Sequence, residues 1–379
     1  MMLVPLLVGL AGAALVLFVL WDAFETMLVP RRIGRRVRFT RYFYLVTWRA
    51  WRAIARRIGK LSRRESLLGV YGPLSLILLL ACWAVGLIVA FALLQQAARG
   101  FAGLSPERMG TLVYLSGETF FTLGFGDITP ATNLGRGLSV LEAGMGFAFL
   151  GTVIGYLPTL YSAFSQREIA ISMLDARAGS APTAAEFMAR FRSIGGDAMK
   201  DAALRDWERW SAQLLETHIS YPQLAYYRSQ HINQSWLSAL TAILDSCALL
   251  LAGSDPTSKP QAKLTFAMAR HALVDVMQIF VSRYEPGGLD RLPHADLMQL
   301  AAYLGQTHAA MGSSPEFEQR LTALRRMYEP YAQALSRYLL MDLPPWLCKS
   351  PRPDNWRRGP WDQQLGGQTS PDVGDDDHF

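Results

Sequence analysis

The chain has few charged residues and few cysteines. Charged residues make up 18% of its 379 residues and hydrophobic residues 51%, so it is less charged and more apolar than an average soluble protein. Cys82, Cys247 and Cys348 are too few and too far apart to form a disulfide framework. This composition argues against a small disulfide-rich secreted domain and predicts a membrane protein that also has a water-soluble part.

Residues 166–348 lack the sequence signatures of enzymes and of nucleotide or metal binding. There is no Gly-x-Gly-x-x-Gly between a strand and a helix, which a dinucleotide-binding domain would need. The sequence also shows no nucleophile with its base, no phosphate loop and no sustained alternation typical of strands. The histidines have no paired metal-ligand spacing; they are His218, His231, His271, His294 and His308. We therefore expect a protein that is not an enzyme and has no cofactor, and whose regulatory ligand the sequence does not identify.

Three apolar runs are long enough to cross a membrane as a helix, which takes roughly 20 residues. Met2 to Trp21 and Leu67 to Leu94 contain no charged residue, and the third run, about Leu134 to Phe164, contains Arg136 and Glu142. No basic residue precedes the first run, and several follow it, which is the opposite of a cleaved secretory signal. We therefore predict three transmembrane helices, the first of them uncleaved.

Basic residues are concentrated between the first two apolar runs. From Arg31 to Arg64 there are thirteen Lys or Arg and no Asp or Glu, whereas Gln95 to Gly110 contains only Arg99 and Arg108. Because basic loops stay in the cytoplasm, the amino terminus is expected outside, as is the segment between the second and third helices. The remaining carboxy-terminal domain is then cytoplasmic, in a multi-pass protein of the cell inner membrane.

The outer segment contains the string Thr122-Leu-Gly-Phe-Gly-Asp127. Gly124 and Gly126 can adopt left-handed backbone angles, which let successive carbonyl groups face one axis as an ordinary strand cannot. Before this string, Met109 to Phe121 is apolar and too short to span, which predicts a re-entrant helix buried in protein. Ser105 to Glu107 would be its capped start. Taken alone, Gly-x-Gly is more often a Gly-rich turn between two helices, but the six-residue string between two membrane helices favours a filter.

In this context, residues 67–165 resemble the two-helix pore module of the tetrameric pore-loop potassium channel superfamily, with an extra transmembrane helix before it. The resemblance implies that backbone carbonyls replace the hydration shell of K⁺. It also implies a homotetramer, because each chain supplies one filter strand. The K⁺ ions would bind at Thr122, Leu123, Gly124 and Phe125, with Gly126 completing the filter.

The resemblance further assigns residues that support the filter. Glu118 matches a pore-helix carboxylate that in some bacterial members shares a proton with the aspartate after the filter, here Asp127, and Tyr114 matches an aromatic residue beside the filter. Leu123 departs from the usual Val or Ile, and Phe125 replaces the more frequent Tyr. The Leu123 side chain would lie behind the filter and outside the ion path. Potassium selectivity is therefore expected, with a non-selective cation channel as the alternative.

The third apolar run is expected to line the inner cavity and to open the pore. Its glycines and proline fit both bending and close helix packing; they are Gly144, Gly146, Gly151, Gly155 and Pro158. Glu142 is costly inside a membrane helix and is expected to face a cavity or a partner. It would either raise the local cation concentration or pair with a basic group, and the sequence does not separate these roles.

The basic segment, residues 31–66, has arginines at the three-residue spacing of a voltage sensor, at Arg32, Arg35, Arg38 and Arg41. A voltage sensor needs three preceding spanning helices, whereas only one is predicted before this segment. This argues against voltage sensing. From Tyr44 to Leu61, apolar residues follow helical spacing while the basic residues occupy other faces, which predicts an amphipathic helix on the anionic inner leaflet of the lipid bilayer. Its position between two membrane helices argues against nucleic acid as a partner.

Residues 166–348 are expected to fold as a cytosolic α-helical bundle. Thr183 to Glu186 matches a capping box, and Trp236 to Ala252 is expected to be a buried core helix because Asp245 interrupts its apolar run. Leu224 to Trp236, rich in aromatic and polar residues, is expected to be a polar packing seam, with a sensor or a subunit interface as the alternatives. Helical periodicity extends over Asp197 to Ser220, Pro222 to Gly253, Lys259 to Tyr284, Ala295 to Gly312 and Pro315 to Leu340.

The sequence thus predicts an all-α membrane protein with five parts. They are the first transmembrane helix (1–30), the basic segment (31–66), the pore domain (67–165), the helical domain (166–348) and a disordered tail (349–379). The expected function is passive K⁺ conduction, gated by the inner helix and regulated by the helical domain. A membrane signalling protein with a vestigial pore is the alternative from another class.

Overall fold

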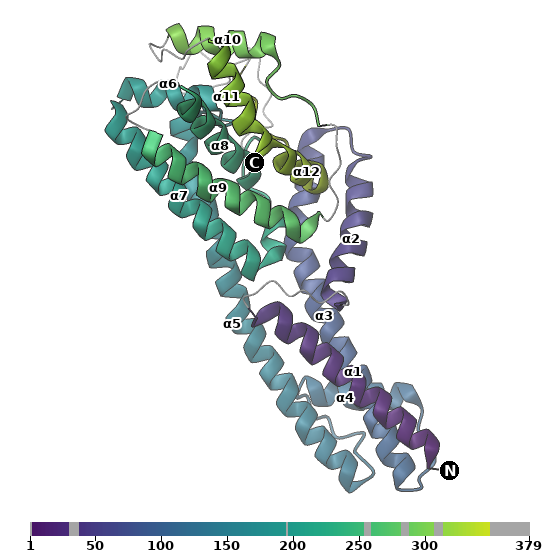
Figure 1. The fold of residues 1–379 in the computed structure, drawn as a ribbon. Helices are drawn as coiled ribbons and strands as arrows, with labels where there is room; N and C mark the ends of the chain where they lie inside the picture. Colours follow the sequence, from purple (N-terminus) through teal and green to yellow (C-terminus); the bar gives the residue numbers. More distant parts are fainter. Residues whose placement is uncertain are drawn as a thin grey trace, which may run out of the picture. The chain divides into compact units, whose positions relative to one another are not determined.

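The structure is a computed structural model that describes residues 2–29, 38–194, 196–253, 259–281, 288–306 and 314–348. Within these ranges the chain forms helices and loops and no strand (Figure 1), which confirms the all-α prediction. Three helices are long and apolar enough to cross a membrane: α1 (Leu3–Met27), α3 (Leu61–Phe101) and α5 (Asn133–Ala178).

Two sets of sequence predictions lie outside the described residues. One is the predicted disordered tail, residues 349–379, and the other is the group of arginines at positions 31, 32, 35 and 36. The described chain divides into two units. Helices α3 and α5 contribute to both of them, and each unit is described by itself.

The first unit comprises Met1–Ala53 and Tyr71–Ser162. Within it, α1 lies very close to α3 because the contact is made by small residues. A Cβ added at Gly12 would lie 2.8 Å from the carbonyl oxygen of Ala90, and one at Gly86 would lie 3.1 Å from Val19. Small residues at such contacts let two membrane helices approach each other closely. The predicted first transmembrane helix is therefore present, and it is longer than its apolar run.

Helix α2 (Phe39–Ala55) is amphipathic, as the sequence predicted. Trp48 is buried with its ring centroid 4.8 Å from that of Tyr71 on α3, and Trp51 lies 5.8 Å from the same ring. Part of the apolar face of α2 therefore packs on α3. The exposed side of α2 carries Arg41 and Arg49 together with Val46, and its contact with the inner leaflet stays a prediction.

The short helix α4 (Met109–Phe120) begins later than the sequence predicted. Its N-cap is Arg108, with no side-chain cap, so the expected cap at Ser105 is wrong. The preceding loop is held to α3 instead. The side chain of Arg99 pairs with Glu107 at 3.2 Å, and the amide of Gln96 accepts a hydrogen bond from the Glu107 N–H at 3.3 Å. These contacts keep the loop extended until Arg108.

The second unit comprises Ile54–Val70 and Ala163–Phe379. Its centre is α8 (Trp236–Ala252), whose residues are buried almost without exception, so α8 is the buried core helix that the sequence predicted. The surrounding helices are α6 (Ala184–Ile194), α7 (Gly196–Ser220), α9 (Lys259–Phe280), α10 (His294–Gln306), α11 (Pro315–Arg326) and α12 (Glu329–Leu339).

Half of the predicted capping box at the start of α6 is formed. The hydroxyl of Thr183 accepts a hydrogen bond from the Glu186 N–H at 3.2 Å. The return bond is missing, because the Glu186 carboxylate binds Arg190 and Tyr303 and the Thr183 N–H donates to the Ala178 carbonyl. The box therefore starts the helix and also ties α6 to α10.

Two predicted helices are each broken into two pieces. Pro222 to Gly253 consists of the short 3₁₀ helix η1 (Pro222–Tyr226), a loop, and α8, whose N-cap Ser235 accepts a hydrogen bond from the Ser238 N–H at 3.0 Å. Pro315 to Leu340 is interrupted between α11 and α12 at Tyr328. At the second break Pro330 stands in the first turn of α12, where its fixed φ and missing N–H are tolerated.

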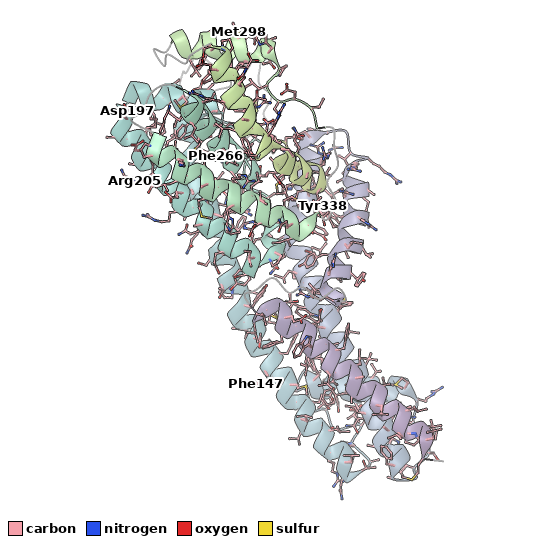
Figure 2. The ribbon with its side chains drawn as sticks, viewed as in Figure 1. Phe147, Asp197, Arg205, Phe266, Met298 and Tyr338 are labelled. Atoms are coloured by element: carbon pink, nitrogen blue, oxygen red, sulfur yellow. The ribbon has the colours of Figure 1, made fainter. Side chains whose placement is uncertain are left out.

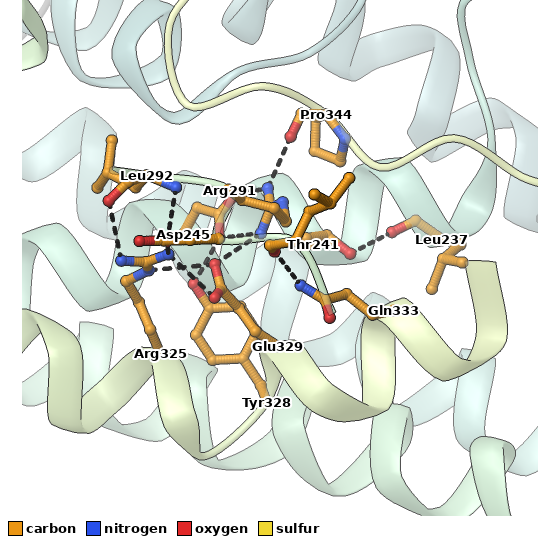
Figure 3. A network of polar contacts seen from close by, with 12 residues as sticks. Leu237, Thr241, Asp245, Arg291, Leu292, Arg325, Tyr328, Glu329, Gln333 and Pro344 are labelled. Carbon is orange, nitrogen blue, oxygen red and sulfur yellow. Dashed lines mark hydrogen bonds and ion pairs between the residues drawn. The ribbon is translucent and has the colours of Figure 1, made fainter. Parts of the chain in front are cut away.

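A buried ionic network holds α8 to the carboxy-terminal helices (Figure 3). Asp245 is fully buried on α8; its carboxylate binds the Arg291 guanidinium at 2.6 and 3.1 Å and accepts a hydrogen bond from Tyr328 at 2.5 Å. Glu329 binds Arg291 at 3.2 Å and Arg325 at 3.1 Å. Burial, followed by the charge of Asp245, raises the pKa of Tyr328 well above its usual value. Tyr328 therefore stays neutral and acts as a donor.

We expect Asp245→Ala to lower the free energy of unfolding of the second unit by about 3–5 kcal/mol, because it leaves Arg291 buried without its main counter-charge. Thermal unfolding of the purified full-length protein would measure this change. Asp206→Ala is the matched control: Asp206 pairs with Arg209 at 3.9 Å on the surface, and loss of that pair is expected to cost about 0–1 kcal/mol. Equal effects of the two substitutions would contradict the structural role given to Asp245.

Candidate functional site

The segment after α4 has the backbone that its glycines predicted. Gly124 and Gly126 have φ angles of 63° and 77°, and Thr122 is also left-handed at 56°. Left-handed residues therefore alternate with Leu123 and Phe125, which is the pattern that allows neighbouring carbonyl groups to share one direction. An ordinary Gly-rich turn does not need three left-handed residues at every second position.

The start of this segment is fixed to the end of α4 by the backbone. The N–H of Thr122 donates to the Thr119 carbonyl at 3.0 Å, and the N–H of Leu123 donates to the Glu118 carbonyl at 2.8 Å. Gly124 and Gly126 have no heavy atom within 4 Å of an added Cβ. At these two positions the requirement for glycine is therefore conformational and does not come from crowding.

The predicted supporting residues are arranged differently from the expectation. The hydroxyl of Tyr114 donates to the Asp127 carboxylate at 3.4 Å. Glu118 is buried, and its Oε2 has no hydrogen-bond partner among the described residues. The structure thus brings Tyr114 and Asp127 together and does not form the contact between Glu118 and Asp127 that the resemblance implied.

The four glycines and the proline predicted for gating are not equivalent. A Cβ at Gly146 would overlap the carbonyl group of Phe120 at the end of α4, whereas Gly144, Gly151 and Gly155 have no neighbour within 4 Å of an added Cβ in the single chain. Gly146 is therefore a packing residue that lets α5 touch α4. Pro158 lies inside α5, which the structure gives as one helix from Asn133 to Ala178.

Glu142 faces neither a basic group nor solvent in the single chain. It is 0% exposed on α5, and its Oε1 lies in hydrogen-bond contact with the hydroxyl of Ser116 on α4. The same hydroxyl lies 2.7 Å from the carbonyl oxygen of Ile88 on α3. The contact of Ser116 with Glu142 was not predicted from the sequence, although a serine within the apolar run of α4 was the available signal.

A second polar cluster, at the end of α1, was also missed. The Asp22 carboxylate accepts hydrogen bonds from the Thr40 N–H at 3.2 Å, from the Thr40 hydroxyl at 2.6 Å and from the Trp83 indole N–H at 3.0 Å. It thereby joins α1, the first turn of α2, and α3. A carboxylate at the start of a helix is favoured by the unpaired N–H groups there. Its sequence signal was an acidic residue directly after an uncharged run.

In the second unit, the parts of α3 and α5 that belong to it bind the same stretch, from η1 to the loop before α8. The Arg167 guanidinium on α5 donates to the carbonyls of Leu224 and Tyr227, both at 2.9 Å. Glu65 on α3 pairs with Arg228 at 3.4 Å, and Arg228 donates to the carbonyl of Leu340 at 3.1 Å. These contacts form a packing seam that links α3, α5 and α12. The stretch consists of the end of η1 and a loop instead of one continuous helix.

Comparison with known proteins identifies the segment that carries the filter-like string. Residues 76–162 match the model of a family described as "Ion channel", Ion_trans_2, and this range contains α4, the left-handed segment and the first part of α5. This segment is a pore-loop ion-channel domain. Helices α1 and α2 and nearly all of the second unit lie outside the matched range.

The chain also resembles an uncharacterized membrane protein, YdjJ of Bacillus subtilis (strain 168). The two are 24% identical over 240 residues, which cover 62% of this chain and 68% of that protein. No solved structure matches the chain. The pore-loop domain and the three long apolar helices together make this chain a membrane protein.

We expect Gly146→Ala to destabilise the pore-loop domain by about 1–3 kcal/mol, because its methyl group overlaps the end of α4. Gly144→Ala, on the same helix with open space around it, is expected to leave stability within about 0.5 kcal/mol. Thermal unfolding in detergent would compare the two. A destabilisation by Gly144→Ala that matches that of Gly146→Ala would contradict the packing role.

Proposed function

We propose that this protein is a passive, potassium-selective channel in which four identical chains surround one pore. The observation that carries the proposal is the alternation of left-handed residues at Thr122, Gly124 and Gly126, within a pore-loop ion-channel domain. A chain with this backbone offers a row of carbonyl oxygens that can replace the hydration shell of a cation. The proposed K⁺ sites are at Thr122, Leu123, Gly124 and Phe125.

The surface of α5 supports a symmetric assembly. Its most exposed apolar residues are seven apart, at Val140, Phe147, Ile154 and Tyr161, and Phe147 is 75% exposed (Figure 2). Seven residues are about two helical turns, so these four side chains form one stripe. An apolar stripe on a membrane helix is covered by lipid or by another chain, and we assign part of this face of α5 to its neighbours in the homotetramer.

The distribution of charge supports the orientation. The amino terminus is placed outside and the second unit in the cytoplasm, because the basic residues gather between α1 and α3. Arg41 and Arg49 on the exposed face of α2 would then contact the anionic headgroups of the inner leaflet. Nucleic acid is not part of this proposal.

The decisive test is ion flux through the purified protein in liposomes. We expect reversal potentials that favour K⁺ over Na⁺, and Gly124→Ala to lower K⁺ flux at least about tenfold, because an L-residue is strained at a φ of 63°. Gly117→Ala is the matched control, since Gly117 also has open space around it but lies within helix α4. Equal K⁺ and Na⁺ permeability would favour a non-selective cation channel. No flux at all would favour a membrane signalling protein with a vestigial pore.

The seam between η1 and α8 supports regulation of the inner helix by the helical domain. Arg167 lies on α5 itself, so a change in the loop that binds it would act directly on the helix whose amino-terminal part belongs to the pore. Coupling of this kind needs an element that has two arrangements, and the buried Arg167 contacts define one of them.

We expect Arg167→Ala to change the open probability of the channel several-fold without shifting its K⁺/Na⁺ reversal potential, because it frees α5 from Leu224 and Tyr227. Arg177→Ala is the control on the same helix, where the guanidinium binds the Met173 carbonyl one turn away. Single-channel recording would measure both variants. An unchanged open probability in Arg167→Ala would argue against regulation through this seam.

A further inference from the structure

The contact between Glu142 and Ser116 joins all three helices of the pore-loop domain. Glu142 comes from α5, Ser116 from α4 and the accepting carbonyl of Ile88 from α3. Both side chains are 0% exposed. This contact is therefore a buried junction close to the place where α5 touches the end of the pore helix at Gly146.

The number of hydrogen atoms available for hydrogen bonds at this junction determines the protonation state of the Glu142 carboxyl group. A serine hydroxyl has a single hydrogen to donate, and a backbone carbonyl can only accept. The Ile88 carbonyl therefore takes the Ser116 hydrogen, since two oxygen atoms 2.7 Å apart need a hydrogen between them. The bond between Ser116 and Glu142 then needs a hydrogen that comes from the carboxyl group. In this arrangement Glu142 is protonated and donates.

The surroundings of Glu142 agree with a neutral carboxyl group. Its Oε2 is buried and has no hydrogen-bond partner within the described part of the chain, and an ionised carboxylate would be very costly in such a place. Among the described residues, no charged group forms a hydrogen bond or ion pair with it. The titratable or charged groups on the first-unit parts of these helices are Tyr114 and Glu118 on α4, Tyr71, Cys82 and Arg99 on α3, Arg136, Tyr156 and Tyr161 on α5, and Asp22 and Glu25 on α1.

We propose that Glu142 is a positioning residue for the filter, and that its proton keeps α4 joined to α3 and α5. The proposal rests on the proposed channel function of the same domain. Loss of the proton removes the donor to Ser116 and leaves a charge between the helices. The carboxylate could accept the Ser116 hydrogen only at the expense of the bond to the Ile88 carbonyl, and its charge would remain buried. Movement of α5 away from α4 or entry of water would relieve that charge, and either change disturbs the segment that starts two residues after the Phe120 carbonyl.

The test is the pH profile of K⁺ flux through the full-length protein in liposomes. The flux of the wild type is expected to fall at least about tenfold as the pH rises from about 6 to about 10. Glu142→Gln is expected to conduct across this range without the fall, because a neutral amide N–H can still donate to Ser116. Glu142→Leu, which cannot donate, is expected to have low flux at every pH. Glu118→Gln changes the other buried carboxyl group; whatever its flux at pH 6, the relative fall at alkaline pH is expected to remain.

A second measurement separates this proposal from the channel function. The thermal stability of the detergent-purified wild type is expected to decrease over the same pH range, and that of Glu142→Gln is expected to decrease less. If the wild type carries no flux at any pH but this difference in stability is found, the channel function fails and the protonated junction stands. If the wild type conducts and Glu142→Gln shows the same alkaline fall in flux and stability, the proposal for Glu142 is overturned. A fall that disappears in Glu118→Gln would assign the titrating group to Glu118.

Discussion

The position of the left-handed segment, Thr122 to Gly126, depends on how the short helix α4 is held between α3 and α5. Ser116 connects the middle of α4 to the Ile88 carbonyl and to Glu142, and Gly146 lets α5 touch the Phe120 carbonyl at the end of α4. The left-handed segment starts directly after that point, at Thr122. Because closely packed helices do not deform freely, the backbone of this segment takes its position from these few contacts.

Buried carboxylates connect helices in both units, but with different partners. In the first unit, Asp22 is satisfied by N–H and hydroxyl donors from Thr40 and Trp83. In the second, Asp245 is satisfied by the charged guanidinium of Arg291 and by the Tyr328 hydroxyl. A fully satisfied buried polar group fixes one arrangement of the helices around it, since any other arrangement leaves it unpaired.

Much of the first unit could be predicted because its signals are local. A membrane helix is recognised as an uncharged apolar run of sufficient length. Gly124 and Gly126 indicate left-handed backbone angles that few other residues adopt. The prediction of a helix cap at Ser105 was wrong because Gln96 and Arg99, which precede Ser105 by several residues, bind Glu107 and keep the loop extended. The amphipathic character of α2 was predicted correctly, but its packing against Tyr71 was not, because periodicity does not show which helix covers an apolar face.

The sequence by itself determined the helical class, the three helices long and apolar enough to span a membrane, the buried core helix α8 and the glycine-dependent backbone of Thr122 to Gly126. Only the tertiary structure decided which polar residues meet: Tyr114 with Asp127, Ser116 with Glu142, Asp22 with Thr40, and Arg167 with the loop after η1. The physical reason is distance along the chain. Hydropathy and backbone preference are properties of neighbouring residues, whereas these contacts join residues 13 to 60 positions apart, and a sequence pattern does not show where a folded chain brings them together.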